Sequence, residues 1–215
     1  RFKWQSYTTW MTGFALLVLV YYLGGGAFLV DPRVSGVSVN AAIGIGLGTV
    51  FGGFIVYDLL CRSKLPPHVL SAICVARVGG VAYGLSQILS GRAAYMHVGA
   101  MLGTIMAGNV FMHIIPSQKE LVGATQRGEP PSHALSQRAK FRSIHNNYIT
   151  FPMLFLMISN HFSSFYSHHF SWVLLLVLMT GGALVRHFMN IRFVFPSWRY
   201  GLASTIAVTI GLLFF

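Results

Sequence analysis

The sequence contains very little charge. Only 9% of its 215 residues are charged and only 4 are Asp or Glu, whereas 54% are hydrophobic. A soluble domain carries about 25% charged residues, so this composition excludes an ordinary water-soluble fold. In place of charge, the chain has successive apolar runs of about 20 residues, each long enough to cross a bilayer. The runs are continuously apolar and do not alternate, which favours helices over a barrel.

The apolar runs predict an all-α, polytopic transmembrane bundle of about seven helices, forming a single integral membrane domain over residues 1–215. The expected spans are 7–30, 37–61, 69–89, 93–115, 144–162, 170–187 and 198–215. Pro116 is expected to end the fourth span. The following loop, 117–143, is the only substantial one, and we expect its second half, 134–143, to be a helical run-in to the fifth span.

Basic residues are distributed very unevenly between the two sides of this bundle. Only Arg33 and Arg92 fall on one side. The other side receives Arg1, Lys3, Arg62, Lys64, Lys119, Arg127, Arg138, Lys140, Arg142, Arg186, Arg192 and Arg199. The asymmetry predicts that the N-terminus and the loops after the second, fourth and sixth spans are cytoplasmic. The C-terminus then lies outside, which is the periplasm if the protein sits in a bacterial inner membrane. Lipid is the expected partner. Nucleic acid is not, because no basic stripe is interleaved with aromatics.

Cysteines and hydrolytic motifs are also scarce. The two cysteines, Cys61 and Cys74, form no CxxC or CxxCH motif, so the chain binds no covalent haem c of its own. A nucleophile elbow, a phosphate loop, a zinc-protease motif and paired carboxylates are all missing, which leaves hydrolysis without visible machinery. Redox chemistry on a bound cofactor fits this composition better.

Histidine is the residue type that stands out, with 9 in the chain. Five lie in or at the ends of spans, where an ionisable group is costly and is therefore a functional candidate: His97, His113, His145, His161 and His187. Antiparallel packing of the fourth and fifth spans brings His97 level with His161 near the periplasmic face. Two imidazoles at one depth suit a bis-histidine haem b, so we predict that this pair binds the haem iron. Packing histidines are the alternative.

Three further polar residues need partners inside the bilayer. Arg77 falls near the bilayer centre, where its guanidinium requires a haem propionate, an anionic substrate, Asp58 or backbone carbonyls. Asn146 and Asn147 beside His145 are placed to hydrogen-bond a planar polar ligand, or else to cap the start of the fifth span.

Small residues recur every fourth position on the second span, at Gly44, Gly48 and Gly52. This spacing is typical of helices whose backbones approach closely. The same face is also consistent with room beside a flat cofactor.

Several segments together resemble one known family. They are YMHVGAMLGTIMAGNV from Tyr95, IIPSQK up to Lys119, RSIHNNYIT from Arg142, MISNH up to His161, VRH up to His187 and VYDLLCR up to Arg62. The chain is similar over essentially its whole length to the membrane domain of the bacterial cytochrome c-type urate hydroxylase family. The His-Asn-Asn-Tyr and Ser-Asn-His pieces are the more specific ones.

The resemblance implies oxidation of urate to 5-hydroxyisourate, with electrons passed through haem to a periplasmic cytochrome c. Family proteins have eight membrane helices and a C-terminal cytochrome c, so we expect a first helix before Arg1 and a haem c domain after Phe215, or on a partner. His145, His187 and Arg77 are the expected catalytic residues, serving an anionic purine or a second cofactor.

A different class of function remains open. The chain could be an accessory subunit, with or without haem, of a larger respiratory or photosynthetic electron-transfer complex. A transporter or channel is disfavoured because the sequence shows no inverted repeat.

Overall fold

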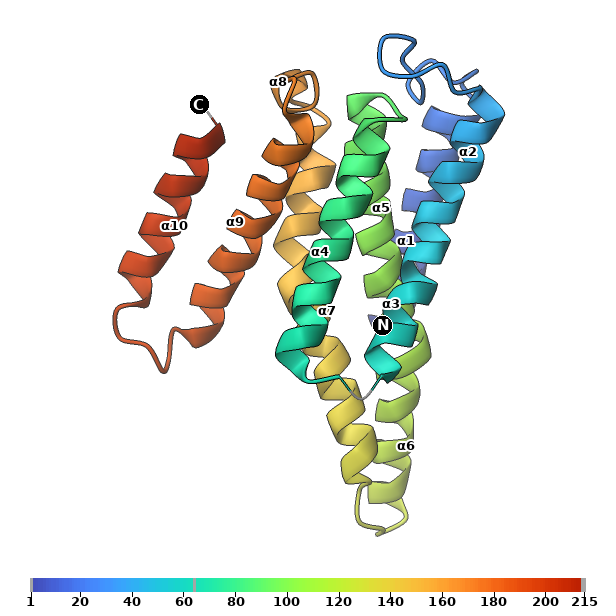
Figure 1. The fold of residues 1–215 in the computed structure, drawn as a ribbon. Helices are drawn as coiled ribbons and strands as arrows, with labels where there is room; N and C mark the ends of the chain where they lie inside the picture. Colours follow the sequence, from blue (N-terminus) through green and yellow to red (C-terminus); the bar gives the residue numbers. More distant parts are fainter. Residues whose placement is uncertain (1, 64, 214–215) are drawn as a thin grey trace.

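The computed structural model describes residues 2–63 and 65–213, and all regular secondary structure within them is helical (Figure 1). The elements are α1 (Phe2–Leu17), η1 (Val18–Tyr22), α2 (Val39–Leu47), η2 (Gly48–Gly52), α3 (Gly53–Arg62), α4 (Pro67–Ser86), α5 (Gly91–Gly108), η3 (Asn109–Ile114), α6 (Ile115–Gln126), α7 (His133–Ser159), α8 (Ser163–Tyr166), α9 (Ser171–Ile191) and α10 (Trp198–Leu213). The η elements are π-helical turns that continue their neighbours, so 39–62 and 91–126 are single long helices. The predicted all-α class is confirmed.

Four of these helices are long and apolar enough to cross a membrane, namely 39–62, 67–86, 91–126 and 171–191. With the helix 2–22, α7 and α10 they make the expected set of about seven long helices. The first one ends at Tyr22 and not at residue 30. Gly25 and Gly26, with φ of 67° and 80°, turn the chain there in a conformation that favours glycine. Arg1, Lys64 and the predicted helix end at Phe215 lie outside the described residues.

The prediction that Pro116 ends the fourth span is wrong, because the helix continues through it to Gln126. The wide turn η3 immediately precedes this proline, and Ile115 N donates to Val110 O across that turn. Pro116 therefore stands in the first turn of α6, where its missing N–H is not needed. By contrast, the expected helical run-in over 134–143 is confirmed. It belongs to α7, which Ser132 caps.

The helix α5 lies at the centre of the bundle. In the most apolar stretch of the helix 91–126, 61% of the residues are buried. In the corresponding stretches of the three other candidate spans the share is 17–22%. This helix packs against α1, α2–α3, α4 and α7, while α9 packs on α7 and α10 packs on α9 (Figure 1). The hairpin of α6 and the first turns of α7 extends beyond the rest of the bundle at one end. The described end of α10 lies at the opposite end.

The glycine repeat of the second span meets no other helix in the described part of the chain. A Cβ added at Gly44, Gly48 or Gly52 would meet nothing within 4 Å, so this face does not pack closely against the described part of the chain. The close approaches occur at Gly46 and Gly53 on the other side. There an added Cβ would lie 2.6 Å from the His97 ring and 2.5 Å from the Met101 side chain. Spacing alone identifies a helix face, but not the face that meets a neighbour.

Candidate functional site

A buried carboxylate on α3 lies at the centre of the polar interior. Asp58 is only 7% exposed and accepts three hydrogen bonds from cationic or imidazole donors. Arg62 Nη2 lies 2.6 Å from its Oδ2, while Arg142 Nη2 and His113 Nε2 lie 2.7 Å and 2.6 Å from its Oδ1. Arg142 and His113 are themselves buried, so water does not solvate these polar groups. The hydrogen bonds to Asp58 therefore connect α3, η3 and α7.

The wide turn η3 contributes two side chains to this interior, Asn109 and His113. Asn109 Oδ1 accepts a bond of 3.1 Å from Arg142 Nη1, because a guanidinium can only donate. Its Nδ2 then donates to the Tyr57 hydroxyl at 3.0 Å and to Asn146 Oδ1 at 2.8 Å. Single π-helical turns inside α-helices frequently mark functional sites, and this one directs Asn109 and His113 into the polar cluster.

His145 lies at the far end of the same chain of bonds. Its Nδ1 is 2.8 Å from the Tyr57 hydroxyl. Because Tyr57 already accepts from Asn109, its own proton is directed to His145 Nδ1, and the ring hydrogen of His145 therefore sits on Nε2. We call Asp58, Arg142, Asn109, Tyr57, His113 and His145 the Asp58 network.

Arg77 stays outside this network. Its Nη2 donates to the Gly53 carbonyl at 2.8 Å and lies 4.0 Å from Met101 Sδ. Of the partners that the sequence allowed, the backbone carbonyl is the one observed. A pairing with Asp58 is wrong, because Arg142 and Arg62 occupy that carboxylate. Arg77 Nη1 is buried and forms no hydrogen bond within the described residues, so it is a cationic donor without a partner.

The opposite face of α7 carries the other predicted site residues. His187 on α9 lies 2.9 Å from the Tyr148 hydroxyl through its Nδ1. Asn147 Oδ1 accepts from Arg186 Nε at 2.9 Å and from Asn190 Nδ2 at 2.7 Å. The helix α7 thus divides the predicted residues: His145 and Asn146 face inward, whereas Asn147 faces α9. The capping alternative for the two asparagines is wrong, because α7 begins at His133, well before them.

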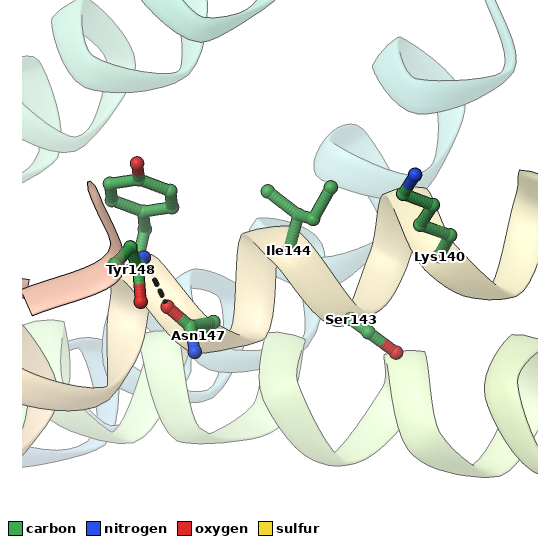
Figure 2. Close-up of a pocket in the computed structure, with 6 residues that line it drawn as sticks. Lys140, Ser143, Ile144, Asn147 and Tyr148 are labelled. Carbon is green, nitrogen blue, oxygen red and sulfur yellow. Dashed lines mark hydrogen bonds between the residues drawn. The ribbon is translucent and has the colours of Figure 1, made fainter. Parts of the chain in front are cut away.

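A hollow of about 470 Å³ opens on this outer face, between α7 and the end of α9 (Figure 2). Its lining consists of Lys140, Ser143, Ile144, Asn147, Tyr148 and Asn190. In Figure 2 the five labelled side chains stand on successive turns of α7, whereas Asn190 belongs to α9. The hollow therefore brings together a cation, two amides and two hydroxyl groups beside one apolar wall.

His97 is held in the tautomer that histidine has when its Nε2 binds a metal. Its ring is fully buried, and Nδ1 lies 2.7 Å from the Ala93 carbonyl. A carbonyl only accepts, so the hydrogen is on Nδ1, and the lone pair of Nε2 accepts from the Tyr22 hydroxyl at 2.9 Å. The second predicted ligand, His161, is exposed in the turn after α7, and no contact joins it to His97. The residues fit one axial ligand, and the opposite ligand is not in place.

Sequence reasoning missed the hydroxyl that accompanies each of three predicted histidines. Tyr22, Tyr57 and Tyr148 hydrogen-bond His97, His145 and His187 respectively. It also missed Arg142 and Asn109, although Asn109 is a lone amide within an apolar run. That amide was the one available signal, since a polar side chain at membrane depth requires a partner.

An all-helical bundle with membrane-length apolar helices and a buried cluster of Asp, Arg, Asn and His is a polytopic membrane protein with an internal polar site. Residues 1–214 match the family model described as urate oxidase N-terminal, so the chain belongs to that family. Comparisons with curated proteins and with solved structures give no match. The resemblance seen in the sequence segments is therefore confirmed at the level of the family.

Proposed function

We propose that this chain is the membrane-embedded part of an oxidoreductase that oxidises urate and passes the electrons to a cytochrome c. The observation that carries the proposal is the family match along residues 1–214. Urate and one water give 5-hydroxyisourate, two electrons and two protons, so the protein must hold an anionic purine, accept protons and deliver electrons. The bundle contains side chains suited to the first two tasks.

His145, His187 and Arg77 are the proposed catalytic residues. His145 and His187 are each hydrogen-bonded through Nδ1 to a tyrosine, and in the described part of the chain neither Nε2 has a hydrogen-bond partner. Those nitrogens are positioned to exchange hydrogen bonds or protons with a substrate. Arg77 Nη1, a buried donor without a partner, is suited to an anionic oxygen of the substrate or of a haem propionate.

Haem b is the proposed cofactor, and His97 and His161 are the residues that would hold its iron. When bound, a haem would supply one-electron acceptor chemistry that the side chains lack. The Ala93 carbonyl would hold the His97 ring in its ligating tautomer, while the Tyr22 hydroxyl would have to leave Nε2. His161 would have to turn inward from its exposed turn.

The proposed setting is the bacterial inner membrane, with lipid around the bundle. The basic hairpin of α6 and α7 would lie on the cytoplasmic side, and the end of α10 on the periplasmic side, where a cytochrome c domain or protein would receive electrons. Figure 1 supports this arrangement, since the hairpin and the described end of α10 lie at opposite ends of the bundle.

A reduced-minus-oxidised visible spectrum of the purified protein, followed by urate-dependent reduction of added cytochrome c, tests the proposal. We expect a b-type haem signal and electron transfer that depends on urate. Absence of both results would overturn the proposal.

A haem signal without urate oxidation would favour the second candidate, an accessory subunit of an electron-transfer complex. One observation favours that candidate: the open face of Gly44, Gly48 and Gly52 is shaped for close approach by another helix.

A further inference from the structure

Lys140 on α7 and Arg186 on α9 have no acidic partner in the described part of the chain. The chain has only 4 Asp and Glu residues, and the structure pairs all of them elsewhere. Asp31 binds Arg33, Asp58 binds Arg62 and Arg142, and Glu120 and Glu129 both bind Arg127. Lys140 and Arg186 therefore lie on this face with no carboxylate to neutralise them. A site of net positive charge at the edge of an apolar bundle attracts an anion.

The hollow beside these cations is lined with directed hydrogen-bond donors. Both bonds to Asn147 are accepted by its carbonyl oxygen, from Arg186 and Asn190. Its Nδ2 consequently remains a donor with no partner among the described residues. Ser143 and Lys140 add a hydroxyl and an ammonium group, and all five labelled side chains come from consecutive turns of α7 (Figure 2). Several hydrogen-bond donors beside one cation suit an anion whose ring edge carries several oxygens.

We propose that the hollow between α7 and α9 is the docking site of an oxopurine anion, with Lys140 and the Asn147 amide as its principal contacts. This inference rests on the proposed function and assigns a place to its substrate. The volume of about 470 Å³ lies within the range of small-molecule pockets, about 300–1,000 Å³. Ile144 offers an apolar surface for the ring. Tyr148 connects the hollow to His187 through a bond of 2.9 Å, which brings a predicted catalytic residue next to the ligand.

The same donors suit the phosphate of a lipid headgroup, so the experiment must separate the two sources. Urate binding is measured by equilibrium dialysis, without an electron acceptor, on protein in nanodiscs of phosphatidylcholine. The measurement is then repeated in nanodiscs containing phosphatidylglycerol. We expect Lys140→Met to weaken urate binding about fivefold and Asn147→Ala about tenfold, as for one charge and one group of directed hydrogen bonds. The matched control is Lys119→Met, which removes an exposed lysine of α6 outside the hollow.

Unchanged urate affinity in both Lys140→Met and Asn147→Ala overturns the docking site. A second result would also overturn it: urate binds weakly in every sample, and phosphatidylglycerol competes strongly with urate in the wild type but not in Lys140→Met. The hollow would then hold a lipid headgroup. In turnover assays the variants should raise KM with little change in kcat, as expected for lost ground-state binding. If wild-type protein oxidises urate and the variants keep its KM, the docking site fails and the proposed function stands. If urate binds as described but no electrons are transferred, the proposed function fails and the site stands.

Discussion

Replacing Asp58 by Asn removes the one carboxylate that neutralises the interior of the bundle. The residue is 7% exposed, and its partners Arg142 and His113 are 3% and 2% exposed. With the carboxylate gone, the Arg142 guanidinium stays buried without a counter-charge, and removal of one member of a buried ion pair costs about 3–5 kcal/mol. A domain of 150–250 residues loses about 2–4 °C of Tm per kcal/mol, so we expect Tm to fall by about 6–20 °C.

The assay is thermal unfolding of the purified protein in detergent, followed by circular dichroism. Arg142→Met should also destabilise, because it leaves Asp58 facing only Arg62 and His113. The double variant should lose less than the sum of the two single losses, with a coupling of about 0.5–3 kcal/mol for residues in one network. Glu129→Gln, which breaks an exposed pair with Arg127, is the control and should leave Tm unchanged. Equal, small losses for Asp58→Asn and for this control would refute the reasoning.

Three other predictions test individual contacts. Tyr57→Phe removes the hydroxyl that fixes His145, so urate-dependent electron transfer should fall about tenfold in kcat while Tm changes little; an unaltered rate would separate His145 from the chemistry. Gly46→Ala forces a methyl group against the His97 ring and should cost about 1–3 kcal/mol in urea unfolding, whereas Gly48→Ala, which faces open space, should cost nothing or stabilise. His97→Ala should abolish a low-spin b-type haem signature in the visible spectrum, and an unchanged spectrum would exclude His97 as a ligand.

Hydropathy was sufficient to predict the helices, because burial in lipid requires long apolar runs whatever their neighbours. It failed at two helix ends for local reasons. Apolar composition carried the first span through Gly24–Gly26, where glycine conformation ends the helix at Tyr22. At Pro116 a general rule about proline was applied without knowledge of the wide turn before it. Backbone conformation at such points depends on tertiary packing, which a single sequence does not display.

The site was predictable in its residue types and not in its pairings. A helix advancing about 100° per residue allows side-chain directions to be calculated from spacing. The π-helical turns at 48–52 and 109–114 break that regular advance in two of the three helices that contribute to the Asp58 network. Directions beyond them, including those of Tyr57 and His113, cannot be obtained by counting residues. This is why an Asp58–Arg77 pair was a reasonable expectation and Arg142 is the observed partner.

Two fixed groups determine the direction of every bond that leads to His145. The Arg142 guanidinium only donates, so it orients the carbonyl oxygen of Asn109, and the Asn109 nitrogen must then face Tyr57. The Met106 carbonyl only accepts, so it turns the Asn146 oxygen toward the same Asn109 nitrogen. Both constraints direct the Tyr57 proton to His145 Nδ1 and leave Nε2 as a donor.

The ring of His97 is held in the opposite tautomer to that of His145. The Ala93 carbonyl takes the Nδ1 hydrogen and leaves a lone pair on Nε2, the form that binds a metal. Two histidines, His97 buried and His145 half-buried, are each bonded to a tyrosine and are held in different tautomers by the groups behind them. The Nε2 of His97 therefore offers a lone pair, whereas the Nε2 of His145 offers a hydrogen. It follows that Asn109→Asp, which substitutes an acceptor for the donor facing Tyr57, should reverse the Tyr57–His145 bond and impair urate oxidation without altering a haem spectrum that depends on His97.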